Sequence, residues 1–343
     1  MSEPGQADSA RSRVPRPSPA RVLGAVAVVA ALGLGAGVLS ASHAGGPITS
    51  MTLGGGGSPS PTSADGPAAP GPSTVPTAQR VAAPRPPPFT SVRRNVRCTG
   101  PGTPAARRRA ALVQNRVGAA AAAAGAHVAA GVEDLRTGVR CSLRGTRRYD
   151  SASIVKVTIV ATLLRKARAE GRALSSSERT RARASITRSD NAATTAMWRS
   201  IGRGAGMQRF LTAARMTRTV PGSGQYWGLT QVTADDELKL LAVLARDGVL
   251  TARERGFLLG LMRDVVSSQR WGVPAGAPAK ASVANKNGWL PRATAGWRVH
   301  SIGQVSGGGR AYTLSLLSDH NSSWDAGITR LETLARAAHL ALR

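Results

Sequence analysis

The segment that decides the fold is Ser-Ile-Val-Lys at residues 153–156, within the stretch SASIVKVTIVATLLRKARA at residues 151–169. Apolar and polar residues alternate at helical spacing over 154–169, so this stretch is predicted to be a helix. Ser153 then lies just before the helix, at its positive end. Lys156 follows one turn later on the same face.

This pairing indicates a nucleophile that needs no histidine. A lysine buried beside other cations can lose its proton near neutral pH and accept one from a hydroxyl group. Lys156 would then activate Ser153. The alternative is structural: Ser153 only caps the helix and Lys156 is an ordinary helix lysine.

A second motif, Ser189-Asp190-Asn191, precedes a predicted helix at 192–201. The Ser189 hydroxyl could relay a proton to a leaving nitrogen, and the Asn191 amide could orient Lys156 and bind a substrate carbonyl. Ser-Asp-Asn is also a good helix cap, and capping would hold these side chains rigidly.

A third motif, Lys286-Asn287-Gly288, falls on a predicted strand and is followed by Trp289. A cation at Lys286 would attract a substrate carboxylate, and Gly288 would let the strand approach the substrate closely. The backbone amides of Trp289 and Ser153 could form an oxyanion hole. The alternative is a lysine at a strand edge followed by an Asn-Gly turn.

The order of predicted elements indicates an α+β fold. A strand pair is followed by a block of helices, three strands and a closing helix, so we expect a five-stranded antiparallel sheet flanked by helices. The predicted strands cover 127–135, 139–143, 284–288, 298–306 and 312–318, and the closing helix covers 325–342.

The three motifs, in this order and on these elements, resemble the class A β-lactamase and penicillin-binding serine hydrolase family, which includes D,D-peptidases. The resemblance covers nearly all of residues 101–343. It implies that Ser153 is the acylated nucleophile and Lys156 its base. It also implies that Ser189 is the proton shuttle and that Lys286 with its neighbour Asn287 anchors a carboxylate.

The chain departs from the family pattern in three places. Asn287 stands where the family has threonine or serine, and the 36 residues from Ser153 to Ser189 are a shorter interval than expected. Class A enzymes also use a loop glutamate to activate the deacylating water, but residues 191–234 contain no acid. Gln225 can hold a water molecule there without taking its proton. We therefore expect slow deacylation.

The sequence thus predicts a β-lactamase-like serine hydrolase acting on β-lactams or D-alanyl peptides, with no cofactor. One alternative is a cell-wall D,D-carboxypeptidase that β-lactams trap. The other is a non-catalytic module that binds the wall or senses penicillin.

The net positive charge of the chain indicates which partners it could bind. Lys and Arg number 46 against 18 Asp and Glu, a formal net charge of +28. Such a charge attracts polyanions, here an anionic cell wall or membrane surface, although a solvated basic surface is an equal alternative. Scattered arginines, 3% aromatic residues and the lack of a recognition motif disfavour nucleic acid. A monomer is expected.

The N-terminal part indicates export. A basic segment at 1–21 precedes an uncharged apolar run within 22–44, long enough to cross a bilayer. It is either a single-pass anchor with a cytoplasmic N-terminus or a signal peptide cleaved near residue 44. A Pro/Gly/Ser-rich linker is predicted at 45–97 and the hydrolase domain at 98–343, outside the cytoplasm.

The two cysteines, Cys98 and Cys141, are expected to form one disulfide in an oxidising compartment. Two cysteines cannot supply a structural zinc site, and the five histidines show no ligand spacing along the sequence. The sequence therefore indicates no metal.

Overall fold

The computed structural model describes residues 86–246 and 248–343. The expectations for the basic segment at 1–21, the apolar run at 22–44 and most of the linker fall outside these residues. Within the described part of the chain, no helix is long and apolar enough to span a membrane.

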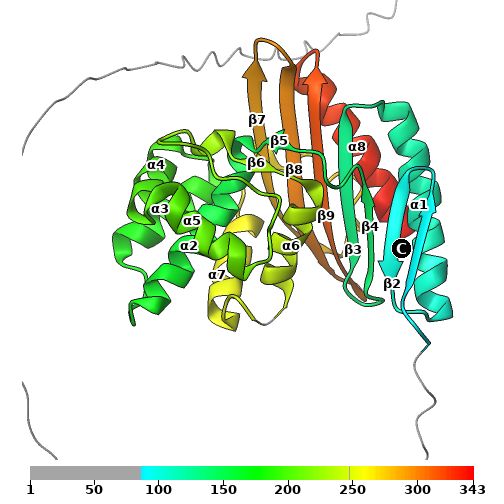
Figure 1. Ribbon diagram of the computed structural model, residues 1–343, viewed down its shortest axis with the longest axis horizontal. Helices are drawn as coiled ribbons and strands as arrows, with labels where there is room; N and C mark the ends of the chain where they lie inside the picture. The colour runs from blue at the N-terminus through cyan, green and yellow to red at the C-terminus, as the bar shows by residue number, and fades with distance from the viewer. Residues whose placement is uncertain (1–85, 247) are drawn as a thin grey trace, which may run out of the picture. The chain divides into compact units, whose positions relative to one another are not determined.

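The fold is α+β, as predicted, and is organised around one antiparallel sheet (Figure 1). The strand order is β1-β2-β4-β3-β9-β8-β7, so that β7 forms one edge. The strands of this sheet are β1 (Phe89–Arg93), β2 (Val96–Gly100), β3 (Val128–Asp134), β4 (Val139–Leu143), β7 (Ser282–Arg292), β8 (Gly296–Gly307) and β9 (Arg310–Asn321).

Helices cover both faces of the sheet (Figure 1). The first and last helices pack together on one face, while six helices form a block on the other. Those on the first face are α1 (Pro104–Ala124) and α8 (Trp324–Ala341). The block consists of α2 (Val155–Ala169), α3 (Ser176–Thr187), α4 (Asn191–Ser200), α5 (Arg203–Ala213), α6 (Ala234–Ala245) and α7 (Ala252–Arg263).

Strand periodicity explains the two hydrophobic cores. Alternate residues of a strand point to opposite faces. Accordingly, Leu314 and Leu316 of β9 belong to the core under α1 and α8, whereas Leu317 belongs to the core under the helical block. Helix α2 runs through that second core and is buried over most of its length, including Lys156.

The predicted count of five strands is wrong, because the sheet has seven. Residues 89–97, which the composition places in the linker, form β1 and the start of β2. Arg94 and Asn95 both have positive φ, as in a two-residue hairpin turn. Phe89 and Val96 are buried against α1. The proline-rich composition just before this hairpin obscures its alternating pattern.

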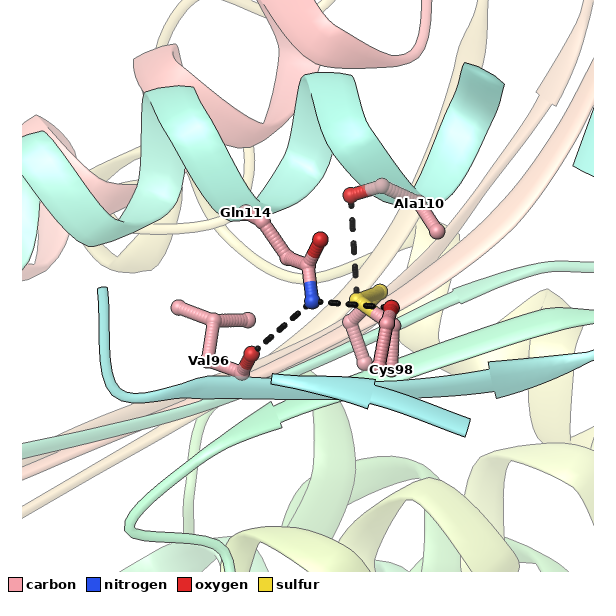
Figure 2. The surroundings of a disulfide bond; sticks show 6 residues. Val96, Cys98, Ala110 and Gln114 are labelled. Atoms are coloured by element: carbon pink, nitrogen blue, oxygen red, sulfur yellow. Dashed lines mark hydrogen bonds between the residues drawn. A yellow bond between two sulfur atoms is a disulfide. The ribbon is translucent and has the colours of Figure 1, made fainter. Parts of the chain in front are cut away.

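The predicted disulfide is confirmed. Cys98 of β2 and Cys141 of β4 are directly paired in the sheet and joined through sulfur. Figure 2 shows this bond beneath α1, where the Gln114 side chain donates a hydrogen bond to the Val96 carbonyl at 3.2 Å. The cross-link and this contact fasten the added hairpin to the sheet and to α1.

A small second sheet positions the start of α2. Strands β5 (Tyr149–Asp150) and β6 (Gln231–Val232) pair antiparallel, and the Ser151 amide donates to the Thr230 carbonyl at 2.8 Å. The chain entering the nucleophile turn is therefore held against the loop at 217–233.

Candidate active site

The predicted nucleophile lies on a strained turn. Ala152 has a φ of 48°, and residues Ala152–Ile154 form a 3₁₀ turn that leads into α2. A non-glycine residue rarely adopts this left-handed conformation, which costs about 1–3 kcal/mol and is often found at functional sites. Ser153 is partly exposed, whereas Ala152 and Ile154 are buried. The turn thus presents the serine at the surface of the site.

Lys156 is fully buried and reaches the second motif. Its Nζ lies 2.6 Å from the Ser189 carbonyl oxygen, 2.8 Å from Asn191 Oδ1 and 3.0 Å from Ser189 Oγ. In the described chain these hydrogen bonds go to the second motif and not to Ser153. The Trp227 ring covers the amine, with its centroid 5.0 Å from Nζ.

Burial first, and then the positive charge of Lys286, lower the pKa of Lys156 from 10.5 to about 6, against the opposing effect of Asp190. A neutral amine has two N–H groups and one lone pair. It can donate to the Ser189 carbonyl and to Asn191 Oδ1, which leaves its lone pair free to accept a proton, whereas the ammonium form donates to Ser189 Oγ as well.

Ser189 lies between the two buried lysines. Lys286 Nζ donates to Ser189 Oγ at 3.1 Å. Burial lowers the pKa of Lys286 to about 7. The backbone of Ser189 has a φ of 60°, and Asp190 caps α4 by accepting from the Ala193 amide at 2.7 Å. The cap and the turn fix the hydroxyl between the two amines.

Gly288 lets β7 approach the nucleophile closely. A Cβ at this position would lie 2.7 Å from the Ser153 backbone nitrogen and 2.9 Å from that of Ile154. Contacts that short exclude any side chain. Trp289 follows on the same edge strand, so the structure brings its backbone alongside the Ser153 turn, where the oxyanion hole is expected.

Asn287 has a different environment from the one its predicted role requires. It is fully buried, and its Nδ2 donates to the carbonyl oxygens of Gln269 at 2.8 Å and Trp271 at 3.0 Å. These bonds brace the segment before β7. The geometry therefore places the Lys286 side chain in the site, whereas the Asn287 side chain bonds β7 to the preceding loop.

Two acids that follow the loop after α5 lie in the protein interior. Asp236 is buried and accepts from the Arg218 amide and the Thr219 hydroxyl. Glu237 is also fully buried, and burial raises its pKa to about 8. Gln225 is exposed on the loop. Asp236 and Glu237 are thus both enclosed in the interior, where bulk water does not reach their carboxyl groups.

Two further residues, Trp227 and His300, hold the elements around the site in place. Trp227 anchors the loop by donating from Nε1 to Thr195 Oγ1 at 3.1 Å, which holds its ring over the amine. His300 Nε2 lies 2.8 Å from the Asp150 carbonyl, and burial lowers its pKa to about 4. It remains neutral and fixes the strand that precedes the nucleophile turn. Neither residue belongs to a local motif.

Comparisons with known proteins agree with this fold. Solved structures similar to the chain include an engineered variant of a reconstructed class A β-lactamase of the last common ancestor of Gram-negative bacteria. It has 19% identity and a TM-score of 0.58, over 67% of this chain and 97% of that one.

A β-lactamase from Xanthomonas campestris pv. campestris has 19% identity and a TM-score of 0.58, over 69% of this chain and 99% of that one. The protein L2, solved with relebactam, has 18% identity and a TM-score of 0.58, over 68% and 98%. No curated protein sequence matches the chain. The model of the β-lactamase enzyme family matches residues 110–181 and 174–342, and the chain belongs to that family.

Proposed function

We propose that the chain forms an acyl-enzyme on Ser153 with β-lactams or D-alanyl peptides. The observation that carries this proposal is the convergence of two buried lysine side chains on one hydroxyl beside the nucleophile turn. Lys156 and Lys286 lie 3.0 and 3.1 Å from Ser189 Oγ. Such an arrangement suits base catalysis by one amine and anion binding by the other.

In the proposed reaction, the neutral Lys156 amine takes the Ser153 proton as Oγ attacks the carbonyl carbon. The new O–C bond forms, and the C–N bond of the lactam or peptide then breaks. The proton passes from Lys156 through Ser189 to the leaving nitrogen. Lys286 binds the substrate carboxylate, and the Ser153 and Trp289 amides receive the oxyanion.

Deacylation is the slow step in this proposal. The absence of any acid at residues 191–234 supports it, since no carboxylate on that loop can activate water. The same observation favours the D,D-carboxypeptidase alternative, in which a β-lactam traps the enzyme. The third candidate, a module that binds the wall or senses penicillin, would not turn substrate over.

Export of the domain is part of the proposal. The arginine-flanked apolar run at 22–44 supports either an anchor or a cleaved signal peptide. The Cys98–Cys141 disulfide supports an oxidising compartment outside the cytoplasm. The net charge of +28 would hold the protein near an anionic wall or membrane surface.

The test uses the full chain, a chromogenic cephalosporin, a fluorescent penicillin and the Ser153→Ala variant. We expect a stable fluorescent label that this variant lacks, with slow colour formation. Sustained rapid colour would contradict slow deacylation. D-alanine release from a wall pentapeptide would identify the peptidase. Absence of both label and turnover in folded protein would overturn the enzyme proposal and favour the non-catalytic module.

A further inference from the structure

Two histidines and an aspartate meet where β3 begins and β9 ends. His127 immediately precedes β3, and its carbonyl accepts from the Asp319 amide at 3.1 Å. His320 follows Asp319 along the chain. Because β3 and β9 are antiparallel neighbours, residues almost two hundred positions apart form one cluster. It takes no part in the proposed hydrolase mechanism.

The spacing of the three side chains fits a metal ion. Asp319 Oδ1 is 3.1 Å from His320 Nδ1 and 3.4 Å from His127 Nδ1. The three candidate ligand atoms all lie within 4.8 Å of one another. Zinc–ligand bonds of about 2.0–2.1 Å in a tetrahedral site place adjacent ligand atoms roughly 3.3 Å apart. The two histidine–aspartate distances bracket that spacing.

One buried nitrogen of the cluster has no hydrogen-bond partner. His127 Nδ1 is shielded from solvent, yet it has no hydrogen-bond partner, although a carboxylate oxygen lies nearby. In the tautomer that leaves Nδ1 unprotonated, its lone pair faces the carboxylate, which is unfavourable, whereas a shared cation would make the same contact favourable. The rings of His127 and His320 are stacked with centroids 4.3 Å apart, so both nitrogens approach the carboxylate from one side.

The surrounding contacts hold the ligands in place. Arg147 donates to Asp319 Oδ1 at 2.9 Å and to Oδ2 at 2.8 Å, and it also donates to the Ala126 carbonyl at 3.1 Å. Such a contact orients the ligating carboxylate, while its positive charge lowers the affinity for a cation. His320 has a φ of 51°, and its amide is bonded to the Ala295 carbonyl at 2.9 Å.

We propose that His127, Asp319 and His320 bind one first-row transition metal ion, with Zn²⁺ and Cu²⁺ the preferred ions. Imidazole nitrogen with one carboxylate oxygen suits these ions and not Ca²⁺ or Mg²⁺. The histidine side chains are 42% and 44% exposed, which leaves room for water to complete the coordination. The ion links the start of β3 to the end of β9.

The other three histidines provide the controls. His300 and His339 are buried, and both ring nitrogens of each are in hydrogen bonds, which excludes them as ligands in the folded protein. His43 lies outside the described residues. The His43→Ala variant therefore measures any binding that the cluster does not provide.

The experiment titrates Zn²⁺ into chelator-treated, tag-free full chain by calorimetry and records the electron paramagnetic resonance spectrum of one equivalent of Cu²⁺. We expect one equivalent of Zn²⁺ and a Cu²⁺ signal with nitrogen hyperfine structure. The double variant His127→Ala/His320→Asn should weaken binding at least tenfold. Asparagine is chosen because it tolerates the left-handed backbone at this position.

The metal-free double variant should keep the circular dichroism spectrum and labelling by fluorescent penicillin, so loss of binding cannot be attributed to misfolding. The His43→Ala protein should bind as the parent does. Two results would overturn the site: no stoichiometric binding to the parent chain, or undiminished binding to the folded double variant. Neither result depends on whether Ser153 is acylated.

Discussion

The pH dependence of acylation tests the convergence of Lys156 and Lys286 most directly. Lys156 has a pKa lowered from 10.5 to about 6, first by burial and then by the charge of Lys286. At pH 7, an ordinary lysine is neutral in roughly three of 10,000 molecules, whereas a pKa of 6 makes about nine in ten neutral. The buried position thus increases the fraction of available base by about 3,000-fold.

The assay is the second-order rate of labelling by fluorescent penicillin between pH 4.5 and 8.5. The rate should rise about tenfold per pH unit below pH 6, reach its maximum between pH 6 and 7, and fall above pH 7 as Lys286 loses the charge that binds the carboxylate. In Lys286→Met the neighbouring charge is gone, so the pKa of Lys156 rises and the rising part of the pH–rate profile (its acidic limb) moves to higher pH. The maximal rate also falls, because the substrate carboxylate loses its partner.

The pH at which the labelling rate rises (the acidic limb), and not the maximal rate, shows whether Lys156 is a base or a merely structural lysine. A rate that does not change between pH 5 and 8 would show that no group with a pKa near 6 controls the reaction. A limb that stays in place in Lys286→Met would show that the two amines do not interact. Either result would refute the role given to Lys156.

Three further predictions follow from single contacts. Gly288→Ala should reduce labelling more than 100-fold, because its Cβ would lie 2.7 Å from the Ser153 nitrogen; an unchanged labelling rate would contradict the close approach. Replacing Cys98 and Cys141 by serine should lower the unfolding free energy by about 4 kcal/mol, from the loop-entropy relation for a separation of 43, as measured by denaturant titration. As pH rises from 4.5 to 8, the unfolding free energy of Glu237→Gln should increase relative to that of the parent by up to about 5 kcal/mol, because folding of the parent keeps this carboxyl protonated. The measurement is the melting temperature of both proteins against pH, in which the buried lysines act equally. Parallel profiles would exclude a neutral buried acid at position 237.

Local patterns predicted most of the fold. The strand Val139–Leu143 has the bounds that the sequence predicted. The missed hairpin at 89–100 shows where such patterns fail. Its strands directly follow a proline-rich segment, and they depend on a cross-link and on α1 for burial. Tertiary contacts decide the conformation of such a segment.

In the candidate site, too, the sequence predicts the features that depend on local structure and not those that depend on tertiary contacts. The motifs place Ser153, Lys156 and Ser189 on the right elements because each is fixed by local helix geometry. The environment of Asn287 could not be predicted, since its partners are carbonyl groups of a loop 16 and 18 residues earlier in the chain. The histidine–aspartate cluster was equally hidden, because only the register of β3 against β9 brings its members together.

The two buried amines also explain how an anionic substrate could prepare the site for its own reaction. With pKa values of about 6 and 7, neither Lys156 nor Lys286 is firmly charged in the free protein at neutral pH. A carboxylate bound beside Lys286 would raise the pKa of that amine and keep it protonated. The fixed positive charge would then repel a second proton from Lys156. Binding would therefore drive the two lysines toward opposite charge states, one suited to hold the carboxylate and the other to take the proton of Ser153.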